Sequence, residues 1–506
     1  MTAPILIGGQ WRAAKAASSF RAENPATREA LDEYPVSTWD DCDEALAAAA
    51  EAFEAMRRMS GEQIATFLEA FAGRIEARKD EIVRMANQET ALPVSPRLAD
   101  NELPRTTNQL RQAASAAREG SWALPTIDAK QNIRSLYAAI GPVIVFGPNN
   151  FPLAFNSASG GDFAAAIAAG NPVIAKANSS HPGTTRLLAE EAFAASQETG
   201  MPAGCVQLIY RTGHADGERL VSDPRTGATG YTGSRSAGLK LKAAADAAGK
   251  PIYLELSSVN PVVILPGALE ERLDDIAGQF ATSCLMGAGQ FCTNPGLIIL
   301  LAGEPTEKFL STVTAKFKAA PVGTLLSAGV AKSLSQGVSA LIRAGAHTLV
   351  GGKTATGQGH CHANTLLRAS GQQFLEAAEA LQTEAFGNAS LVIVAEDLDE
   401  ACHVCQHLEG NLTGCVYSHT AGADDRAYDR IAPILRTKVG RLLNDKMPTG
   451  VAVSPAMNHG GPYPATGHPG FTAVGIPASL RRFAALHCYD NVRPGRLPAL
   501  LRDASS

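Results

Sequence analysis

Val143-Ile144-Val145-Phe146, followed at once by Gly147-Pro148, is the stretch that decides the fold of this chain. Four apolar residues that end in a glycine and a proline are typical of a short buried strand. The pattern of an apolar run followed by an alanine-rich helical segment returns at Val173 to Ala175, Val206 to Tyr210, Gly227 to Tyr231 and Ile252 to Glu255. Repeated strand, helix, strand units predict a parallel sheet with helices on both faces, which binds nucleotides at the carboxyl ends of its strands.

The segments on either side of this sheet follow two other patterns. Residues 38–118 are rich in Ala, Glu, Arg and Leu at helical spacing, clearest in Cys42 to Arg57 and Gln63 to Gln88, and predict a helical layer. A second alternating region runs from Pro261 to about Leu443 and begins with the apolar run Val262 to Leu265 and a helical segment near Glu270 to Leu285. We therefore expect an α/β protein with two domains.

The domain boundaries follow from these patterns. We expect residues 1–118 and 142–256 to form a Rossmann-type cofactor-binding domain, and residues 257–446 to form a second α/β domain that carries Cys292. Residues 119–141 and 479–506 do not obviously belong to either sheet, and we expect them to form a projecting arm and tail. A length of 506 residues agrees with two or three domains, because it exceeds what one hydrophobic core supports.

Composition restricts the class of protein. Hydrophobic residues make up 45% of the chain and charged residues 18%, with a net charge of −5 and no long block of like charge. This balance argues against a nucleic acid or an anionic membrane as partner. We find no export signal and no apolar span near twenty residues, and nine cysteines at irregular spacing indicate reduced thiols. We therefore expect a cytoplasmic enzyme with no membrane attachment.

One cysteine is placed for chemistry. Gly289-Gln290-Phe291-Cys292 puts a thiol in a glycine-flanked, uncharged loop. A thiolate attacks a carbonyl carbon without strong activation, so Cys292 is a candidate nucleophile. A buried structural cysteine is the alternative, and it would be preferred for a cysteine considered alone.

A second group of cysteines has the short spacing of a zinc half-site. It consists of Cys402-His403-Val404-Cys405 and His407. The preceding acidic residues, from Glu396 to Glu400, indicate the start of a helix, and no second ligand pair with matching spacing completes a tetrahedral site. We therefore expect these side chains to lie on a helix and to bind no metal.

The phosphate-binding signal is weak when it is considered by itself. No Gly-x-Gly-x-x-Gly follows a strand in the first α/β region. Gly233-Ser234 stands between a predicted strand and the predicted helix Leu239 to Ala248, where free backbone N–H groups can hold a phosphate. A serine-capped helix after a tight turn explains the same residues equally well.

Six motifs in a fixed order give the chain a clear resemblance to the aldehyde dehydrogenase superfamily over nearly its whole length. They are Asn149-Asn150-Phe151-Pro152, Lys176 at the end of a strand, Gly233-Ser234, Glu255-Leu256, Gly289-Gln290-Phe291-Cys292 and Glu384-Ala385-Phe386-Gly387. Each motif alone is a weak pattern, but six in order make chance an unsatisfactory explanation. The resemblance also implies that the arm forms a homodimer or homotetramer by pairing with the sheet edge of a neighbour.

The resemblance implies a catalytic role for three residues. Cys292 attacks a small aldehyde substrate to give a thiohemiacetal, whose oxygen is held by the amide of Asn150 and the Cys292 backbone N–H. Hydride loss leaves a thioester, and Glu255 activates the water that opens it. A strand-end carboxylate in a salt bridge is the alternative for Glu255, but its apolar neighbours make such a placement costly. The presence of this base favours a free acid as the product.

The resemblance also implies the residues that bind the dinucleotide. Lys176 binds the adenosine ribose, Gly233 and Ser234 the pyrophosphate, and Glu384 and Phe386 the nicotinamide ribose. Many members that prefer NAD carry a glutamate where this chain has Ser179, and a small neutral side chain leaves room for a 2′-phosphate. Arg211 is a candidate partner of that phosphate, although a solvent-exposed loop arginine explains it nearly as well. We therefore expect NADP as the preferred cofactor, with NAD possible.

Departures from the common pattern of the superfamily indicate the substrate. Ser257-Ser258, Asn388 and Gly460 to Thr466 together resemble the branch that oxidises 2-oxoglutarate semialdehyde (2,5-dioxopentanoate) to 2-oxoglutarate in sugar and sugar-acid breakdown. Bacterial fatty-aldehyde dehydrogenases are the neighbours of this branch, so a fatty or general aliphatic aldehyde is the alternative substrate. A substrate with a carboxylate requires a cation in its tunnel.

The candidate cation of the tunnel is Arg105, and its candidate walls are Phe155 and Phe291. The alternatives are a solvated arginine on a helix and ordinary core phenylalanines.

Two other classes of protein stay open. A cysteine hydrolase would need a histidine base, and no histidine lies in a motif near Cys292. A non-catalytic dinucleotide-binding homologue would have no reason to combine Cys292, Glu255 and Asn150.

Overall fold

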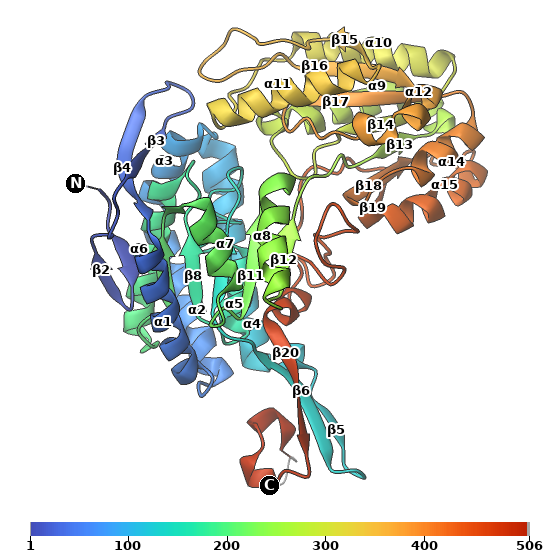
Figure 1. The fold of residues 1–506 in the computed structure, drawn as a ribbon. Coiled ribbons are helices and arrows are strands. Elements are labelled where there is room, and N and C mark those ends of the chain that lie inside the picture. The colour runs from blue at the N-terminus through green and yellow to red at the C-terminus, as the bar shows by residue number, and fades with distance from the viewer. Residues whose placement is uncertain (1, 503–506) are drawn as a thin grey trace.

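The computed structural model, which describes residues 2–502, contains two seven-stranded sheets, each at the centre of its own lobe (Figure 1). The sheet of the first lobe has the order β12-β11-β7-β8-β9-β1-β2. Its strands are β1 (Ile5–Ile7), β2 (Gln10–Arg12), β7 (Val143–Phe146), β8 (Val173–Lys176), β9 (Val206–Ile209), β11 (Ala228–Thr232) and β12 (Ile252–Glu255). The pairs from β12 to β9 are parallel, whereas β1 is antiparallel to both β9 and β2. The predicted parallel sheet is confirmed.

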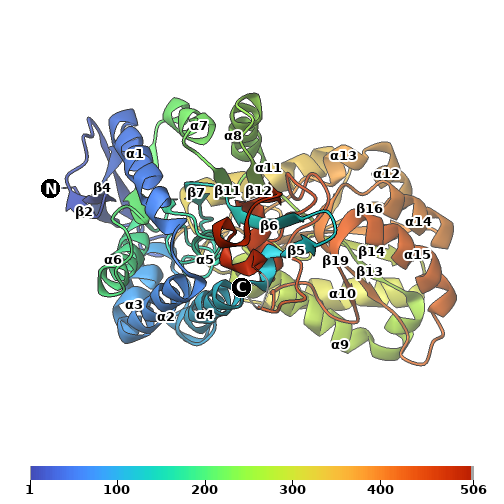
Figure 2. The same ribbon diagram turned by 90° about the horizontal axis from the view of Figure 1, so that it is seen from below.

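Helices cover both faces of this first sheet, as Figure 2 shows with α1, α7 and α8 on one side and α2 to α4 on the other. The helices are α1 (Trp39–Met56), α2 (Gly61–Ala77), α3 (Lys79–Thr90), η1 (Val94–Glu102), α4 (Leu103–Glu119), α5 (Gly161–Ala168), α6 (Pro182–Glu198), α7 (His214–Ser222) and α8 (Arg235–Ala247). The stretch from Gln63 to Gln88, which has helical spacing throughout, forms two helices, because α2 and α3 meet at Arg78. The Arg78 guanidinium pairs there with Glu81, Glu190 and Glu191.

The second lobe is built on a sheet with the order β15-β16-β17-β14-β13-β18-β19. Its strands are β13 (Val262–Ile264), β14 (Leu297–Leu301), β15 (His347–Val350), β16 (Thr365–Ser370), β17 (Ala389–Ala395), β18 (Asn411–Tyr417) and β19 (Val439–Asn444). All neighbours are parallel except β15 and β16. Every residue of β17 and β18 is buried, as expected for central parallel strands that are covered on both faces.

The helices of the second lobe are α9 (Pro266–Leu285), α10 (Glu304–Ala319), α11 (Ala328–Arg343), α12 (Gly371–Glu376), α13 (Ala378–Leu381), α14 (Leu398–Gln406) and α15 (Asp425–Lys438). Cys402 and Cys405 lie on α14, as predicted, and both are buried in the core. Short 3-10 helices complete the chain: η2 (Ser121–Ala123), η3 (Met286–Gly289), η4 (Ala478–Phe483), η5 (Pro494–Arg496) and η6 (Ala499–Leu501). Within residues 2–502, no helix is both long and apolar enough to cross a membrane.

Two smaller sheets lie outside the lobe centres. The first has the order β10-β4-β3 and contains β3 (Ser19–Glu23), β4 (Ala30–Ser37) and β10 (Arg211–Thr212). The second is antiparallel, has the order β20-β6-β5, and contains β5 (Thr126–Asp128), β6 (Ile133–Ala139) and β20 (Ala484–Asp490). This second sheet projects from the first lobe as an arm (Figure 1), and it joins the two segments that the sequence assigns to neither main sheet. The last residues of the predicted tail, 503–506, lie outside the described residues.

Candidate active site

The loop that carries Cys292 has a backbone shape that depends on glycine. It follows α9, and Gly287, Ala288 and Gly289 have φ values of 55°, 56° and 69°. A Cβ atom on Gly289 would lie 2.1 Å from the carbonyl oxygen of Gly387, so no larger residue fits there. The side chain of Gln290 fixes the loop further, because its Nε2 donates to the Gly287 carbonyl at 3.0 Å. The glycine-flanked motif therefore holds the cysteine in one position.

Two asparagines that no motif indicated hold the other side of this loop. Asn260 donates from Nδ2 to the carbonyl oxygens of Cys292 and Asn294, both at 2.9 Å. Asn411 in turn accepts, on Oδ1, the backbone N–H of Asn260 at 3.1 Å and that of Val259 at 2.9 Å. All these partners are far apart in sequence, so spacing alone could not identify them.

Asn150 reaches the same loop from the first lobe. Its side chain is buried, and Nδ2 donates to the Gln290 carbonyl at 3.0 Å. The Asn150 carbonyl accepts a hydrogen bond from Arg97 at 3.0 Å, and the Arg97 guanidinium lies 4.3 Å from the ring centroid of Phe151. The amide predicted to stabilise the oxyanion thus lies beside the nucleophile loop.

Glu255 and an unpredicted histidine complete the centre of the site. Glu255, the last residue of β12, is 2% exposed, and His459 is 1% exposed. Nε2 of His459 lies 3.0 Å from Glu255 Oε1 and 3.5 Å from Cys292 Sγ. No sequence motif places a histidine near Cys292, but the fold brings His459 into contact with it. In the sequence, the signal that could have identified His459 is its position directly before the glycine-rich stretch Gly460 to Thr466.

The electrostatic setting favours a protonated thiol at rest. Burial raises the pKa of Cys292 well above its ordinary value, and the negative charge of Glu255 raises it further. The cation Arg105 lowers the pKa of Cys292, but its effect is smaller than that of burial. A proton must therefore leave the sulfur before it attacks a carbonyl.

Arg105 lies among phenylalanine rings near Cys292. Arg105 lies on α4, and its Nη1 donates to the Val451 carbonyl at 2.8 Å. Within residues 2–502 its Nη2 is buried and has no hydrogen-bond partner. The guanidinium lies 5.1 Å from the ring centroid of Phe155, and Phe151 lies 5.5 Å from Phe291, centroid to centroid. The predicted cation and walls are thus brought together.

A second arginine lies near the thiol and was not predicted. Burial lowers the pKa of Arg441 on β19, and the charge of Cys292 acts in the opposite direction. Arg441 donates to the carbonyls of Pro448 and Gly450 at 3.0 and 3.1 Å. Arg111, by contrast, lies on the surface of α4 and pairs with Glu76 at 2.6 Å. Arg105 and Arg111 therefore lie on the same helix but in different surroundings.

Lys176 and Arg211 form a cationic corner in the first lobe. Burial and, to a smaller extent, the charge of Arg211 lower the pKa of Lys176 to about 8. In the described part of the chain, neither side chain forms an ion pair. Ser179 lies in the turn that follows Lys176. Two unpaired cations beside a small neutral residue fit an anionic group of a dinucleotide.

The turn before α8 offers a second anion site. Ser234 caps the helix, and its Oγ accepts the backbone N–H of Ala237 at 3.4 Å. A Cβ atom on Gly233 would lie 2.7 Å from the hydroxyl oxygen of Tyr231, so the turn requires a glycine. The N–H groups of the first turn of α8 carry the positive end of the helix dipole. These residues fit a pyrophosphate.

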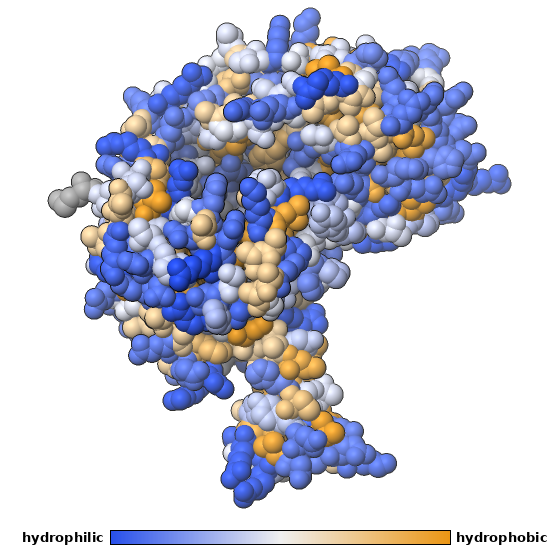
Figure 3. Space-filling view, in the orientation of Figure 1, coloured by the Kyte–Doolittle hydropathy of each residue, from blue (hydrophilic) through white to orange (hydrophobic). Residues whose placement is uncertain are grey.

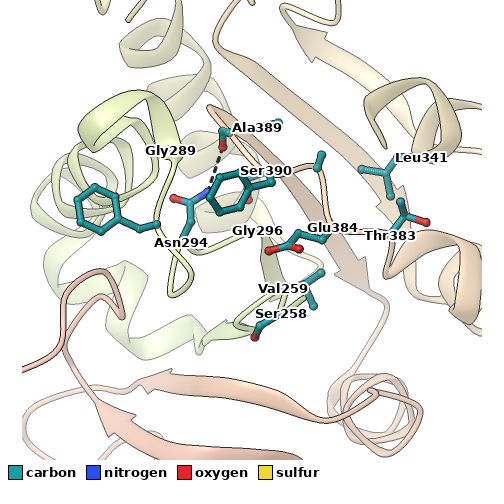
Figure 4. Close-up of a pocket in the computed structure, with 14 residues that line it drawn as sticks. Ser258, Val259, Gly289, Asn294, Gly296, Leu341, Thr383, Glu384, Ala389 and Ser390 are labelled. Atoms are coloured by element: carbon teal, nitrogen blue, oxygen red, sulfur yellow. Dashed lines mark hydrogen bonds between the residues drawn. The ribbon is translucent and has the colours of Figure 1, made fainter. Parts of the chain in front are cut away.

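Glu384 and Phe386 approach from the second lobe. They line a pocket with Ser258, Gly289 and Asn294, and Figure 4 shows Glu384 extending over Val259 and Ser258. Burial raises the pKa of Glu384 to about 8. A neighbouring cavity of about 690 Å³ runs from Arg235 at the start of α8 to Glu384. The hollow between the two lobes is visible in Figure 3.

Comparison with known proteins agrees with this geometry. Residues 11–461 match the model of the aldehyde dehydrogenase family. Alpha-ketoglutaric semialdehyde dehydrogenase 2 of Azospirillum brasilense is 40% identical over 520 residues, which cover 100% of this chain and 97% of the relative. Alpha-ketoglutaric semialdehyde dehydrogenase of Acinetobacter baylyi is 36% identical, over 93% of this chain and 90% of the relative.

A solved structure shows the same fold at low sequence identity. Aldehyde dehydrogenase C of Pseudomonas syringae, in complex with NAD⁺ and octanal, superposes with a TM-score of 0.83 at 20% identity, and the match covers 98% of each chain. The family model spans most of the sequence and includes the loop of Cys292. The chain therefore belongs to the aldehyde dehydrogenase family.

Proposed function

We propose that this aldehyde dehydrogenase oxidises 2-oxoglutarate semialdehyde to 2-oxoglutarate, with NADP⁺ as the preferred cofactor and NAD⁺ accepted. The observation that supports this substrate is the Nη2 atom of Arg105, which is buried and has no hydrogen-bond partner within residues 2–502. An unpaired guanidinium nitrogen is costly unless a ligand supplies an acceptor, and a carboxylate is the acceptor it binds best. Two relatives in the comparison are named for the same semialdehyde.

The proposed orientation of the substrate follows from charge. The aldehyde carbon lies at Cys292, and the oxo-acid end lies toward Arg105. Arg105 is close enough to Cys292 for each charge to shift the pKa of the other group. Phe151, Phe155 and Phe291 pack around the methylene groups between the two ends, because aromatic faces exclude water from an apolar segment.

The carbon–sulfur bond forms when the thiolate of Cys292 attacks the aldehyde carbon. The oxygen of the adduct carries a negative charge, which needs donors already in place. Nδ2 of Asn150 uses one hydrogen for the Gln290 carbonyl, so its second hydrogen can serve the oxygen. The backbone N–H of Cys292 is the second proposed donor.

Oxidation and hydrolysis complete the reaction. A nicotinamide dinucleotide, when bound, accepts the hydride that leaves the carbon of the adduct. The carbon is then a thioester of Cys292, and Glu255 takes a proton from the water that opens it. The products are a carboxylic acid and the free thiol, which restores the starting state of the chain.

The preference for NADP⁺ rests on the cationic corner of Lys176 and Arg211. The two cations repel each other, and a 2′-phosphate relieves this repulsion when it binds between them. Ser179 places no carboxylate in that space.

Initial rates of NADPH and NADH formation test the proposal, with 2-oxoglutarate semialdehyde, octanal and a short unsubstituted aldehyde as substrates. Preference for octanal would indicate a fatty-aldehyde dehydrogenase, and equal rates with NAD⁺ would contradict the cofactor assignment.

Replacing Arg105 by methionine is expected to remove the preference for the oxo-acid. A hydrogen bond to a charged group contributes about 1.5–3 kcal/mol, so kcat/KM for the semialdehyde should fall about 10- to 100-fold. The value for octanal should stay the same or rise, because octanal has no carboxylate. Arg111→Met on the same helix is the control, since Arg111 pairs with Glu76 at the surface. An equal loss with both aldehydes would contradict this role of Arg105.

We propose that the arm forms a homo-oligomer. Both outer strands, β5 and β20, have a free edge in the described part of the chain, and Leu486 on β20 is 61% exposed. Figure 3 shows apolar side chains on this arm. Leu486→Asp should dissociate the oligomer, because an unpaired carboxylate is costly to bury. Light scattering during size exclusion measures the mass, and His487→Asp, on the opposite face of β20, is the control. An unchanged mass in Leu486→Asp would contradict the proposal.

A further inference from the structure

One nitrogen atom, Nε2 of His459, lies between the proposed nucleophile and the proposed base. It is 3.0 Å from Glu255 Oε1 and 3.5 Å from Cys292 Sγ. The oxygen, nitrogen and sulfur atoms all lie within 4.8 Å of one another. The backbone N–H of His459 donates to Thr472 Oγ1 at 2.9 Å, and its ring packs against Phe155 with 5.8 Å between the ring centroids.

The short distance to Glu255 decides where the proton of the imidazole lies. A carboxylate oxygen and an imidazole nitrogen 3.0 Å apart repel each other unless one proton lies between them. With an ionised Glu255, that proton is on Nε2. Nε2 then has no lone pair with which to accept the proton of Cys292, so His459 is not the base of a cysteine hydrolase.

We propose that His459 is a catalytic residue that supplies one N–H donor shared between Glu255 and Cys292. In the resting state the N–H donates to the carboxylate. When Cys292 is activated, its S–H bond breaks, the proton forms an O–H bond with Glu255, and the electron pair stays on the sulfur. The N–H then donates to the thiolate, which is the group that now carries the charge.

The shared donor fits the charge and the free atoms of the site. The negative charge of the pair is conserved during the transfer, so the buried site never holds two anions. Oε2 of Glu255 is buried and has no hydrogen-bond partner within residues 2–502, which makes it the free acceptor for the thiol proton. Three other charged groups act on Cys292, namely Arg105, Arg441 and Glu384. They change the balance between thiol and thiolate, but the hydrogen bond to the sulfur comes from His459.

This inference rests on the proposed role of Cys292 and not on the identity of the aldehyde. The experiment measures the rate of alkylation of Cys292 by iodoacetamide across a pH series, with neither aldehyde nor cofactor present. Mass spectrometry identifies the labelled peptide. His459→Gln and His459→Met are compared, because the two side chains have similar length and only glutamine has an N–H donor.

His459→Met should be alkylated about 10- to 100-fold more slowly than wild type at neutral pH, because the thiolate loses a charge-assisted hydrogen bond. Its alkylation profile should move to higher pH. His459→Gln should retain most of the wild-type rate. Equal rates for the two variants would overturn the inference, since a side chain that only fills space does not distinguish an amide from a thioether.

Two further samples separate this inference from the proposed function. His468→Met, in the same segment and outside the site, reports any general effect of the substitution on the fold. Cys292→Ala gives the background of labelling at the other eight cysteines. A wild-type Cys292 that is not labelled would contradict its role as nucleophile. A labelled Cys292 with equal rates in the two His459 variants would contradict only the shared donor.

Discussion

Replacement of Cys292 by alanine is expected to abolish aldehyde oxidation, with a loss of at least about 10⁴-fold in kcat. The aldehyde carbon cannot give up a hydride until it becomes tetrahedral, and the thiol supplies the bond that makes it so. Asn150, Arg105 and the cofactor residues stay in place in the variant, but they stabilise a charge that never forms. The absorbance of reduced cofactor, followed with 2-oxoglutarate semialdehyde, measures the loss.

The binding of cofactor should survive this substitution. Asn260 holds the loop through the carbonyl of Cys292, which alanine retains. Fluorescence titration with NADPH should therefore give an unchanged Kd, and Cys488→Ala, an exposed thiol on the arm, should keep full activity. Turnover in Cys292→Ala above a few hundredths of a per cent of wild type would contradict the covalent route. A wild type without turnover would indicate a non-catalytic homologue.

The central strands were predictable because they are buried on both faces. β7 has the predicted bounds, since a strand in the middle of a parallel sheet is a continuous apolar run. The last two strands of the first sheet, β1 and β2, were not predicted, because each has only three residues and β1 joins the sheet only by pairing with the distant strand β9. The break at Arg78 was also missed, because the helical periodicity continues across it.

The sequence predicts those site residues that lie within a local motif. Cys292, Asn150 and Glu255 stand in local patterns, and the structure brings all three together. His459 and Arg441 stand in no such pattern. The hydrogen bond between His459 and Glu255 joins residues 204 positions apart, so only the folded chain reveals it. A histidine that touches both reacting groups has no signature in the sequence near either of them.

The arrangement of the lobes explains why the chemistry needs both. Asn150 follows β7 and Glu255 ends β12 of the first sheet, whereas Cys292 lies between α9 and β14 of the second lobe. The proposed oxyanion donor and the proposed base therefore approach the proposed nucleophile from the other lobe. In the proposed mechanism this geometry places Glu255 where it can serve both the sulfur and the water that opens the thioester.

Glu255→Gln is expected to lower kcat about 10²- to 10⁴-fold, which is the usual range for the loss of a general base. Glutamine has the same shape and still pairs with His459, but it cannot take a proton from water. The thioester should therefore form and then persist, so that rapid mixing gives a single burst of reduced cofactor, at most one equivalent per site. Mass spectrometry of quenched enzyme should show the acyl group on Cys292.

The rate of that burst tests whether Glu255 also accepts the proton of the Cys292 thiol. If Glu255 also receives the thiol proton, as the shared donor of His459 requires, the burst itself should be slower in Glu255→Gln than in wild type, and high pH should restore it. A burst at the wild-type rate would restrict Glu255 to the hydrolysis of the thioester. Glu307→Gln, which removes a surface ion pair with Arg368, is the control and should leave both phases unchanged. Steady turnover at the wild-type rate in Glu255→Gln would show that another group activates the water.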